Sequence, residues 1–322
     1  MSYYIAVDIG ATNTRIALGS RDGFLDKAVY RTPRNGDEYT VARMIHGVIV
    51  EKYGALLDRV KAIGIGTIGP LDLEEGRVVN TPNLPIHSFE LRKPLSEWLG
   101  KPVYVLNDAV AAVLGEKYYG LGRGYNNILY ITISTGVGGG AIVDNHLLLG
   151  KKGNAHEVGH IVVEYDSDIP CGCGGYGHWE AYAGGGNIPR TARILAEKHW
   201  KGPETKAYRE AVMERLTPPE LFTLYRSRDS FAEYIVEKII KATIAGLASA
   251  INTYDPEIVT LGGSIYLYNQ DVFKDRVKQG VLKHVVTDPP LIETTPLGGD
   301  IVLYGALALA ANPPRELLAL YK

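Results

Sequence analysis

The sequence predicts an α/β protein made of two domains with a cleft between them. The chain has 322 residues, and a domain usually takes about 150 residues. Short apolar runs typical of strands alternate with segments of helical spacing. A strand–glycine-turn–strand hairpin occurs once in each half, at residues 3–18 and 127–149, as in a duplicated pair of α/β domains.

The first half supplies the first hairpin and a series of alternating elements. Strands are expected at 3–9 and 15–18, around the small-residue turn GATNT. Apolar residues at helical spacing predict a helix over 38–53. A polar, proline-containing connection follows the glycine-ended strand at 61–69. A strand at 102–108 leads into an apolar helix over 109–120.

The second half begins after a glycine-rich joint, GLGRGY at 120–125, which is a candidate domain boundary. Strands are expected at 127–135 and 141–149, joined by the turn GVGGG. Residues 190–200 and 205–253 are predicted to be mostly helical. A strand at 257–265 opens into a glycine turn, and 301–310 form a closing apolar helix.

Composition excludes several classes of protein. Lys and Arg number 34 and Asp and Glu 36, for a net charge of −2, so the chain lacks the basic balance of a nucleic-acid-binding protein. Two cysteines cannot make a disulfide scaffold. The N-terminus has no signal-peptide pattern, and no apolar stretch reaches the roughly 20 residues of a membrane span. We therefore expect a cytoplasmic protein without a membrane partner.

The first hairpin turn is a candidate phosphate site. Small residues allow a tight turn to bring backbone N–H groups to an anion. Asp8, at the strand end, is suited to holding Mg²⁺. The alternative is an ordinary hairpin turn, where Gly and Asn are common. The candidate residues are Asp8, Gly10, Ala11, Thr12, Asn13 and Arg15.

Two further glycine-rich turns are candidates for nucleotide contact. STGVGGG at 134–140, which contains Thr135 and Gly136, partly matches a dinucleotide fingerprint. That fingerprint needs a following helix, whereas residues 141–143 continue as a strand, so a hairpin turn facing a phosphate is favoured. Gly262 and Gly263 form a strand-to-helix turn suited to close approach by a nucleotide. The sequence contains no P-loop motif.

Asp108 follows Asn107 between an apolar strand and an apolar helix. One interpretation is a helix N-cap, which is a common role for aspartate. The other is a general base that accepts the proton of a substrate hydroxyl during phosphoryl transfer. The residues alone favour the cap.

The segment 153–180 is rich in histidine, cysteine and glutamate, and it contains a literal H-E-x-x-H at 156–160. A zinc peptidase would need this motif on a helix. Gly153, Asn154 and Gly159 oppose a helix, and the β-branched residues 161–163 predict a strand. The peptidase interpretation is therefore disfavoured.

A second metal interpretation fits this segment better. His160, Cys171, Cys173 and His178 offer two imidazoles and two thiolates, which suit tetrahedral Zn²⁺. Both cysteines of the chain lie here, two residues apart. A closed site with four protein ligands is structural rather than catalytic. The alternative is a pair of buried thiols with a structural histidine.

Seven motifs occur in this order along the chain: DIGATNTR, TPNLP, NDAVAAVLGE, STGVGGG, HEVGH, CGCGGYGHWE and LGGSI. Taken together, they resemble the ROK family of sugar kinases, most closely its ATP-dependent glucokinases and hexokinases of archaeal type. The resemblance runs from residue 5 to the C-terminal helix. It implies an actin-like, hexokinase-type (ribonuclease H-like) fold with ATP and sugar in the interdomain cleft. A small domain would comprise 1–110 and 303–322, and a large domain, carrying the zinc loop, 111–302.

The resemblance also implies roles for individual residues. Asp108 would be the general base for the sugar's 6-hydroxyl, and His160 would face both zinc and sugar. ATP, Mg²⁺ and a structural Zn²⁺ are the implied cofactors, a hexose and a nucleotide the partners, and a homodimer or homotetramer the assembly. The sugar-binding positions are Asn83, Asn107, Asp108, Glu157, His160 and Glu180. The ATP-binding positions are Asp8, Gly10, Ala11, Thr12, Asn13, Arg15, Thr135, Gly136, Gly262 and Gly263.

Two positions depart from the pattern of the family. His178 stands where the last cysteine of the zinc loop is usual, so we expect a Cys₂His₂ site. His156 stands where a small residue is usual before the glutamate. We expect His156 to be exposed rather than to touch substrate.

These observations favour an ATP:hexose 6-phosphotransferase, with glucose as the first choice of sugar. One alternative is a kinase for fructose, mannose or N-acetylmannosamine. Another is a non-enzymatic sugar sensor, because the family includes repressors. Those carry an added DNA-binding segment before the phosphate hairpin, for which we expect no room here, since the hairpin begins at residue 3.

Overall fold

The computed structural model of the chain describes residues 2–81 and 84–321. The chain folds into two compact units. Unit 1 comprises Met1–Tyr130, Gly140–His156 and Thr295–Lys322, and unit 2 comprises Ile131–Gly139 and Glu157–Thr294. The small domain of 1–110 and 303–322 and the large domain of 111–302 stay a prediction, because these compact units do not test it.

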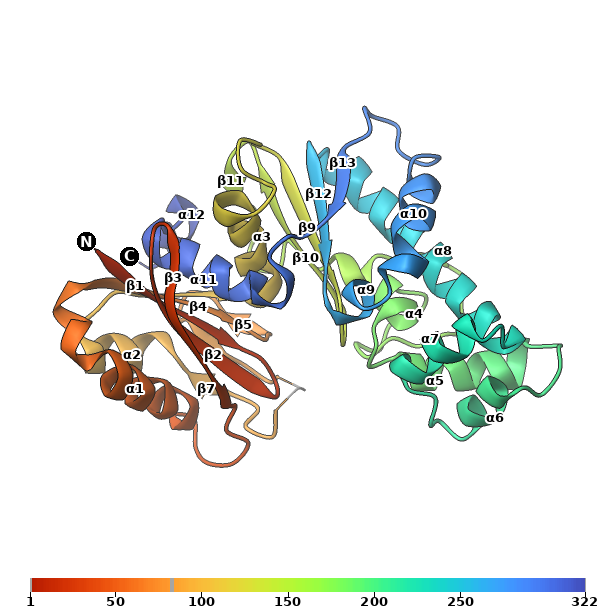
Figure 1. The fold of residues 1–322 in the computed structure, drawn as a ribbon, viewed down its shortest axis with the longest axis horizontal. Helices are drawn as coiled ribbons and strands as arrows, with labels where there is room; N and C mark the ends of the chain where they lie inside the picture. The colour runs from red at the N-terminus through yellow and green to blue at the C-terminus, as the bar shows by residue number, and fades with distance from the viewer. Residues whose placement is uncertain (1, 82–83, 322) are drawn as a thin grey trace. The chain divides into compact units, whose positions relative to one another are not determined.

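Unit 1 is built on a five-stranded sheet of order β3-β2-β1-β4-β8 (Figure 1). The first three strands form an antiparallel meander, and β4 and β8 run parallel to β1. The strands β1, β2 and β4 are largely buried, which matches their apolar sequences. The bounds are Tyr3–Ile9 for β1, Asn13–Ser20 for β2, Gly23–Arg31 for β3, Val60–Thr67 for β4 and Val103–Asn107 for β8.

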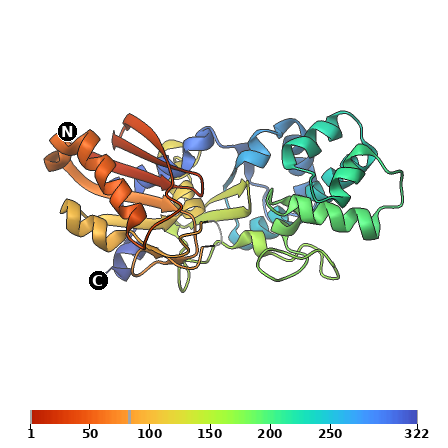
Figure 2. The same ribbon diagram turned by 90° about the horizontal axis from the view of Figure 1, so that it is seen from below.

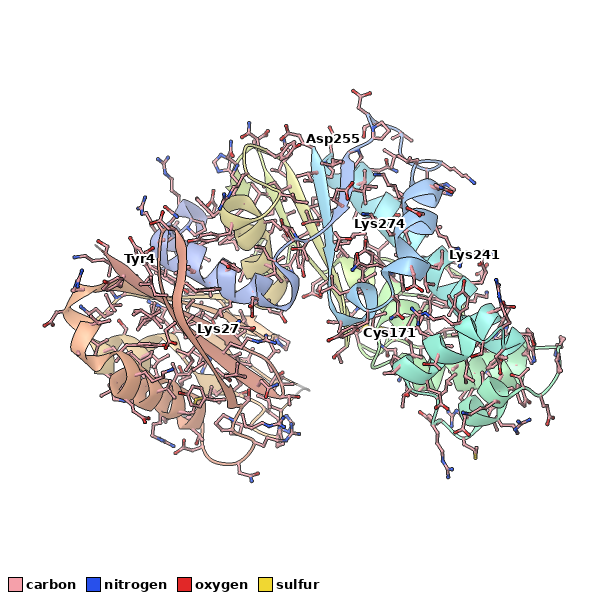
Figure 3. The ribbon with its side chains drawn as sticks, in the orientation of Figure 1. Tyr4, Lys27, Cys171, Lys241, Asp255 and Lys274 are labelled. Carbon is pink, nitrogen blue, oxygen red and sulfur yellow. The ribbon has the colours of Figure 1, made fainter. Side chains whose placement is uncertain are left out.

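The two-residue period of β1 divides its side chains between two cores. Ile5, Val7 and Ile9 pack with residues of α1 (Thr40–Tyr53) and α2 (Arg92–Leu99). These two helices cover one face of the sheet (Figures 1 and 2). Tyr4 and Ala6 pack on the other face with α11 (Ile301–Ala311) (Figure 3). The sheet of unit 1 is therefore covered on both faces.

Helix α11 also packs tightly against α3 (Asp108–Tyr119), the helix that follows β8. A Cβ atom added at Gly305 would overlap the carbonyl oxygen of Ala111. The two helix backbones can approach this closely only because residue 305 is glycine. This packing fixes the helix at whose N-terminus Asp108 lies.

A second five-stranded sheet has the order β11-β10-β9-β12-β13. In chain order this is the pattern of the first sheet: three consecutive strands at one side, then two later strands. The duplication suggested by the two hairpins is thus present in the strand order. The bounds are Ile128–Ile133 for β9, Val137–Val143 for β10, His146–Leu147 for β11, Ile258–Gly262 for β12 and Leu291–Thr294 for β13.

Unit 2 is mostly helical outside its strands. The long helix α8 begins at an N-cap, Asp229, whose carboxylate accepts the N–H groups of Phe231 and Ala232. It packs against α4, α7 and α10 (Figure 1). The bounds are Trp179–Ala183 for α4, Ile188–Ile194 for α5, Lys206–Val212 for α6, Pro218–Arg226 for α7, Ser230–Tyr254 for α8, Ser264–Leu267 for α9 and Gln270–Val281 for α10.

Short elements complete the fold, and α5 continues as a π-helical turn. Among the described residues, no helix is both long enough and apolar enough to span a bilayer. The remaining elements are η1 (Gly54–Arg59), β5 (Leu71–Asp72), β6 (Arg77–Val78), β7 (Phe89–Glu90), η2 (Val158–His160), η3 (Leu195–His199), η4 (Gly298–Asp300) and α12 (Arg315–Leu320).

Two expectations about local structure were wrong. Residues 161–163 form no strand, and Val162 makes only an isolated bridge with His178. In the second hairpin, residues 138–140 lie within β10 rather than in the turn. A Cβ at Gly140 would overlap the carbonyl oxygen of Ala109, so this glycine serves close packing against α3 and not chain reversal.

Two Gly→Ala substitutions in helices of unit 1 should act in opposite directions. Gly305→Ala should lower the free energy of unfolding by about 1–3 kcal/mol, because its methyl group overlaps α3. Gly47→Ala, on the exposed side of α1 with no atom near the added methyl, should raise it by about 0.5–1 kcal/mol. Denaturant midpoints measure both. A Gly305→Ala variant as stable as wild type would contradict the packing described here.

Candidate active site

The first hairpin carries an ion pair beneath its turn between a buried aspartate and a partly exposed arginine. Asp8 and Arg15 lie opposite each other in the β1–β2 ladder, and Arg15 Nη1 is 2.6 Å from Asp8 Oδ2. Asp8 is only 5% exposed. Burial raises the pKa of its carboxyl group, and the hydrogen bond from Arg15 opposes this shift only in part. The structure thus keeps an ionisable carboxyl group where burial disfavours its charged form.

The turn itself is held from the end of β3. The Thr32 hydroxyl donates to the Gly10 carbonyl oxygen at 2.7 Å, and the Thr32 N–H donates to that of Thr12 at 3.1 Å. With these carbonyl groups bonded, the residues at the tip remain partly or fully open to solvent; they are Gly10, Ala11, Thr12 and Asn13. This is the arrangement expected of a turn that presents its backbone to an anion.

Asn107 and Asp108 reach the same edge of this sheet. Ile9 pairs with Thr67, and Thr67 pairs with Asn107, so three parallel strands end side by side. The N-cap of α3 is Asn107, whose Oδ1 accepts the Ala109 N–H at 2.9 Å. Asp108 is the first helical residue, and its Oδ1 accepts the same N–H at 2.8 Å. The N-cap expected at Asp108 is therefore Asn107 instead, one residue earlier.

The second hairpin turn, residues 134–136, lies in unit 2. The N–H groups of Gly185 and Gly186 donate to the carbonyl oxygens of Ser134 and Thr135, each at 2.8 Å. Gly263 has a φ of +86°, and a Cβ there would overlap the backbone of Ile133 at the end of β9. The turn at Gly262 and Gly263 therefore lies against the strand that leads into the second hairpin turn.

A cavity of about 610 Å³ opens beside this turn within unit 2. Its wall is mainly apolar. Arg226 contributes a guanidinium group that pairs with Asp271 at 2.7 Å, and this pairing lowers the pKa of Asp271. The lining residues are Ser134, Thr135, Gly185, Gly186, Pro218, Pro219, Phe222, Arg226, Ser264, Ile265, Tyr268 and Asn269.

Of this lining, the sequence had indicated Thr135 and the neighbourhood of Gly263. Most other residues of the wall were missed. Apolar periodicity can predict that a segment is helical, but it does not indicate which of its residues line a cavity. One signal was available: the run 184–186 contains three consecutive glycines, and such a run is typical of close backbone approach.

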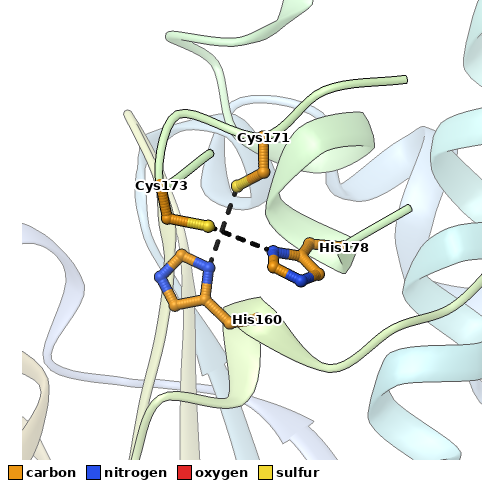
Figure 4. Close-up of side chains that lie close together, drawn as sticks. All are labelled: His160, Cys171, Cys173 and His178. Atoms are coloured by element: carbon orange, nitrogen blue, oxygen red, sulfur yellow. Dashed lines mark hydrogen bonds between the residues drawn. The ribbon is translucent and has the colours of Figure 1, made fainter. Parts of the chain in front are cut away.

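Four side chains of unit 2 converge as expected for a metal site (Figure 4). The ligand atoms of His160, Cys171, Cys173 and His178 all lie within 4.8 Å of one another. His160 Nδ1 is 3.8 Å from Cys171 Sγ, and His178 Nδ1 is 3.3 Å from Cys173 Sγ. Ligands of tetrahedral zinc are about 3.4–3.8 Å apart, given Zn–S and Zn–N bond lengths. The donor set therefore fits Zn²⁺.

The protonation of this cluster follows its environment. Burial raises the pKa of Cys171 to about 11 in the chain without metal. Burial, together with the neighbouring His160, lowers the pKa of His178, which favours the neutral imidazole that binds metals. The other nitrogen of His160, Nε2, faces Glu157 Oε2 at 3.5 Å, so the two ring nitrogens meet different partners.

The H-E-x-x-H segment does not form the α-helix that would place both of its histidines on one face, as a zinc peptidase requires. Only residues 158–160 form a single 3₁₀ turn, η2. His156 is 5% exposed, and its Nε2 lies 2.6 Å from the Gly153 carbonyl oxygen. The expectation that His156 is exposed was therefore wrong, because its ring packs back against the preceding glycine turn.

Of the other predicted sugar residues, Glu180 lies in α4, and one of its carboxylate oxygens accepts the Val137 N–H at 2.9 Å. Glu157 precedes η2, and its side chain is 52% exposed. Asn83 lies outside the described residues.

Comparison with known proteins agrees with this α/β fold. A family model described as the ROK family matches residues 4–312. The glucokinase of Aeropyrum pernix is 40% identical over 321 residues, covering 98% of this chain and 99% of that protein. The chain belongs to the ROK family.

Solved structures of the family superpose on the chain. The ROK hexokinase from Thermus thermophilus gives a TM-score of 0.80 at 30% identity, over 95% of this chain and 97% of that one. A ROK family glucokinase from Streptomyces griseus, in complex with glucose and AMPPNP, gives 0.73 at 28% identity, over 96% and 99%. The fold is therefore that of these sugar kinases, as the motifs predicted.

Asp8 should make stability depend on pH in a specific direction. Its pKa is higher in the folded than in the unfolded chain, so the folded state binds more protons and loses stability as pH rises above the ordinary aspartate value. Asp8→Asn should therefore raise the free energy of unfolding at pH 7 by about 0.5–2 kcal/mol. The gain should shrink as pH falls through the raised pKa.

Denaturant titrations of both proteins between pH 4 and 7 measure this effect. A variant less stable than wild type at pH 7 would show instead that the Asp8–Arg15 pair is a net stabilising interaction.

Proposed function

We propose that this chain is an ATP-dependent kinase that phosphorylates the 6-hydroxyl of a hexose, with glucose as the preferred sugar and Mg·ATP as the donor. Full-length similarity to a glucokinase supports this, as does the similarity to a ROK glucokinase structure that contains glucose and AMPPNP. Magnesium enters with the nucleotide and neutralises phosphate charge during transfer.

The observation that carries the proposal is the edge of the unit 1 sheet where β1, β4 and β8 end. Phosphoryl transfer to an alcohol needs donors for phosphate oxygens and a base for the hydroxyl proton. The open turn after Asp8 offers the donors, and Asp108, two strands away at this edge, offers the carboxylate. Both groups are rigidly placed, since each follows a buried strand.

In this proposal Asp108 accepts the proton as the hydroxyl oxygen attacks the γ-phosphorus. Its Oδ1 already accepts a backbone N–H, which orients the carboxylate. N–H groups of the turns around Gly10 and Thr135, together with Arg15, hold the phosphate oxygens. Gly262 and Gly263 lie near the adenosine, for which the cavity beside Thr135 is the candidate pocket.

The sugar hydroxyls are assigned to carboxylate, amide and imidazole groups. Each carboxylate or amide can bond two neighbouring hydroxyls, which suits a pyranose ring. The half-exposed Glu157, beside the ring of His160, is available to a ligand in this way. The full proposed set is Asn83, Asn107, Asp108, Glu157, His160 and Glu180.

We also propose that the four-residue cluster binds one structural Zn²⁺. The convergence of two thiols and two imidazoles supports this. When bound, zinc would cross-link the loop 160–178. His178 is the residue immediately before α4, so fixing His178 would also fix the start of α4 and the position of Glu180.

Sugar-dependent ADP release by purified protein with Mg·ATP tests the proposed reaction. Glucose, mannose, fructose, glucosamine and N-acetylmannosamine form the panel. Fastest release with glucose supports the proposal, and a faster relative identifies the alternative hexose kinase. Absence of sugar-dependent ADP, together with sugar binding by calorimetry, would favour the sensor.

Asp108→Asn should lower kcat by about 10²–10⁴, the usual contribution of a general base. The amide oxygen can still accept the Ala109 N–H, so the fold should be retained. Nucleotide affinity should stay within about twofold of wild type, because the change removes only the proton acceptor. Turnover near wild type would exclude Asp108 as the base.

Metal analysis should find about one zinc per wild-type chain. Cys171→Ser with Cys173→Ser should lose it, whereas His178→Cys should keep it, because cysteine is an equally good ligand. His284→Ala, which alters an exposed histidine outside the cluster, is the control and should bind zinc normally. A chelator should lower the melting temperature of wild type but not of the double serine variant. Zinc retained by that variant would contradict the site.

A further inference from the structure

The carboxylate of Glu180 lies directly beneath the second hairpin turn. The Val137 N–H donates to Glu180 Oε2 at 2.9 Å. A Cβ added at Gly136 would overlap that same oxygen. The turn and the carboxylate are therefore fitted to each other in the chain without ligands.

Glu180 is one of three supports that the same segment gives to this turn. The N–H groups of Gly185 and Gly186 bond the carbonyl oxygens of Ser134 and Thr135. Val137 N–H, by contrast, has its partner in a side chain. Within the turn, the Ser134 N–H donates to the Gly136 carbonyl oxygen. This bond leaves other backbone polar groups at both ends of the turn without a partner inside it, and α4 and the glycines after it bond those groups.

The segment that supplies these bonds is itself firmly anchored. A helix of five residues has little stability of its own. Trp179 is fully buried, and its Nε1 donates to Thr243 of α8 at 3.3 Å. The Tyr182 hydroxyl bonds both Glu164 and Ser167 of the preceding loop. Glu180 therefore projects from a fixed base toward the turn.

A carboxylate at this place has an electrostatic cost once phosphate binds. Thr135 and Gly136 belong to the turn proposed to contact the ATP phosphates, and like charges a few ångströms apart repel. A neutral acceptor would serve the Val137 N–H without this repulsion. The charge is thus unfavourable for nucleotide binding, whereas the hydrogen bond is favourable.

We propose that Glu180 is a positioning residue for the nucleotide, which fixes the phosphate-binding turn through Val137 independently of any contact with sugar. This inference rests on the proposed kinase function, since it presumes that the turn binds phosphate. The proposal separates the effect of the hydrogen-bond acceptor of Glu180 from the effect of its negative charge. Loss of the acceptor should weaken nucleotide binding, and loss of the charge alone should not.

Calorimetric titration of the full-length, zinc-loaded chain with Mg·AMPPNP in the absence of sugar tests the proposal. Glu180→Ala should weaken binding by about 5- to 30-fold, from the loss of a hydrogen bond to a charged acceptor. Glu180→Gln should bind as tightly as wild type or more tightly, because the amide oxygen still accepts the Val137 N–H and the charge is gone. This rescue separates positioning from general damage to the fold.

Glu157→Ala is the matched control, because Glu157 is another carboxylate proposed to bind sugar and contacts His160 rather than the turn. Its nucleotide affinity should match that of wild type. Glu180→Asp, which keeps the charge but is one methylene shorter, is the second variant if Glu180→Ala does not fold, and it should also weaken binding.

Unchanged affinity in Glu180→Ala or Glu180→Asp would overturn the positioning role while leaving the kinase function intact. Weakened affinity in Glu180→Gln equal to that of Glu180→Ala would overturn it too, because the acceptor would then not be the cause. A wild-type chain that binds no nucleotide would overturn the proposed function and this inference together.

Discussion

Tight turns have backbone groups that the two strands they join cannot bond, and the two hairpin turns of this chain depend on partners outside those strands. In unit 1 the partner is Thr32, which bonds the carbonyl oxygens of Gly10 and Thr12. In unit 2 the partners are Glu180 and the glycines that follow α4. These outside bonds fix the shape of each turn and therefore the directions of its remaining N–H groups.

The cluster of His160, Cys171, Cys173 and His178 matters because of the segment that follows it. His178 ends the loop that carries the cluster, and α4 begins at the next residue. From there the chain continues to Glu180 and to the glycines beneath the second turn. The four cluster residues, the candidate sugar carboxylate and the glycines that bond the second turn thus follow one another along one segment of the chain. A structural metal here would act on binding without touching either substrate.

Much of this was accessible from the sequence because it depends on local pattern. Apolar periodicity predicted β1, α1, β8, α3 and α11, and glycine-rich motifs predicted the turns. The features that the sequence did not predict depend on tertiary contacts. Gly140 has the sequence of a turn residue but lies in a strand against α3, and the β-branched residues 161–163 form no strand because they have only one bridging partner. His156 is buried, and its ring lies within hydrogen-bond distance of the Gly153 carbonyl oxygen; no spacing rule indicates this contact.

The two sheets share a strand order but differ in the reach of the third strand. The nine-residue β3 runs back along β2 as far as the residue opposite Asn13, so that Thr32 arrives at the first turn. The two-residue β11 pairs only with the far end of β10 and stops well short of the second turn. The two turns therefore receive their outside hydrogen bonds from different places. The end of the third strand supplies them in the first sheet, whereas Glu180 and the glycines after α4 supply them in the second. A third strand of full length is thus not needed beside the second turn.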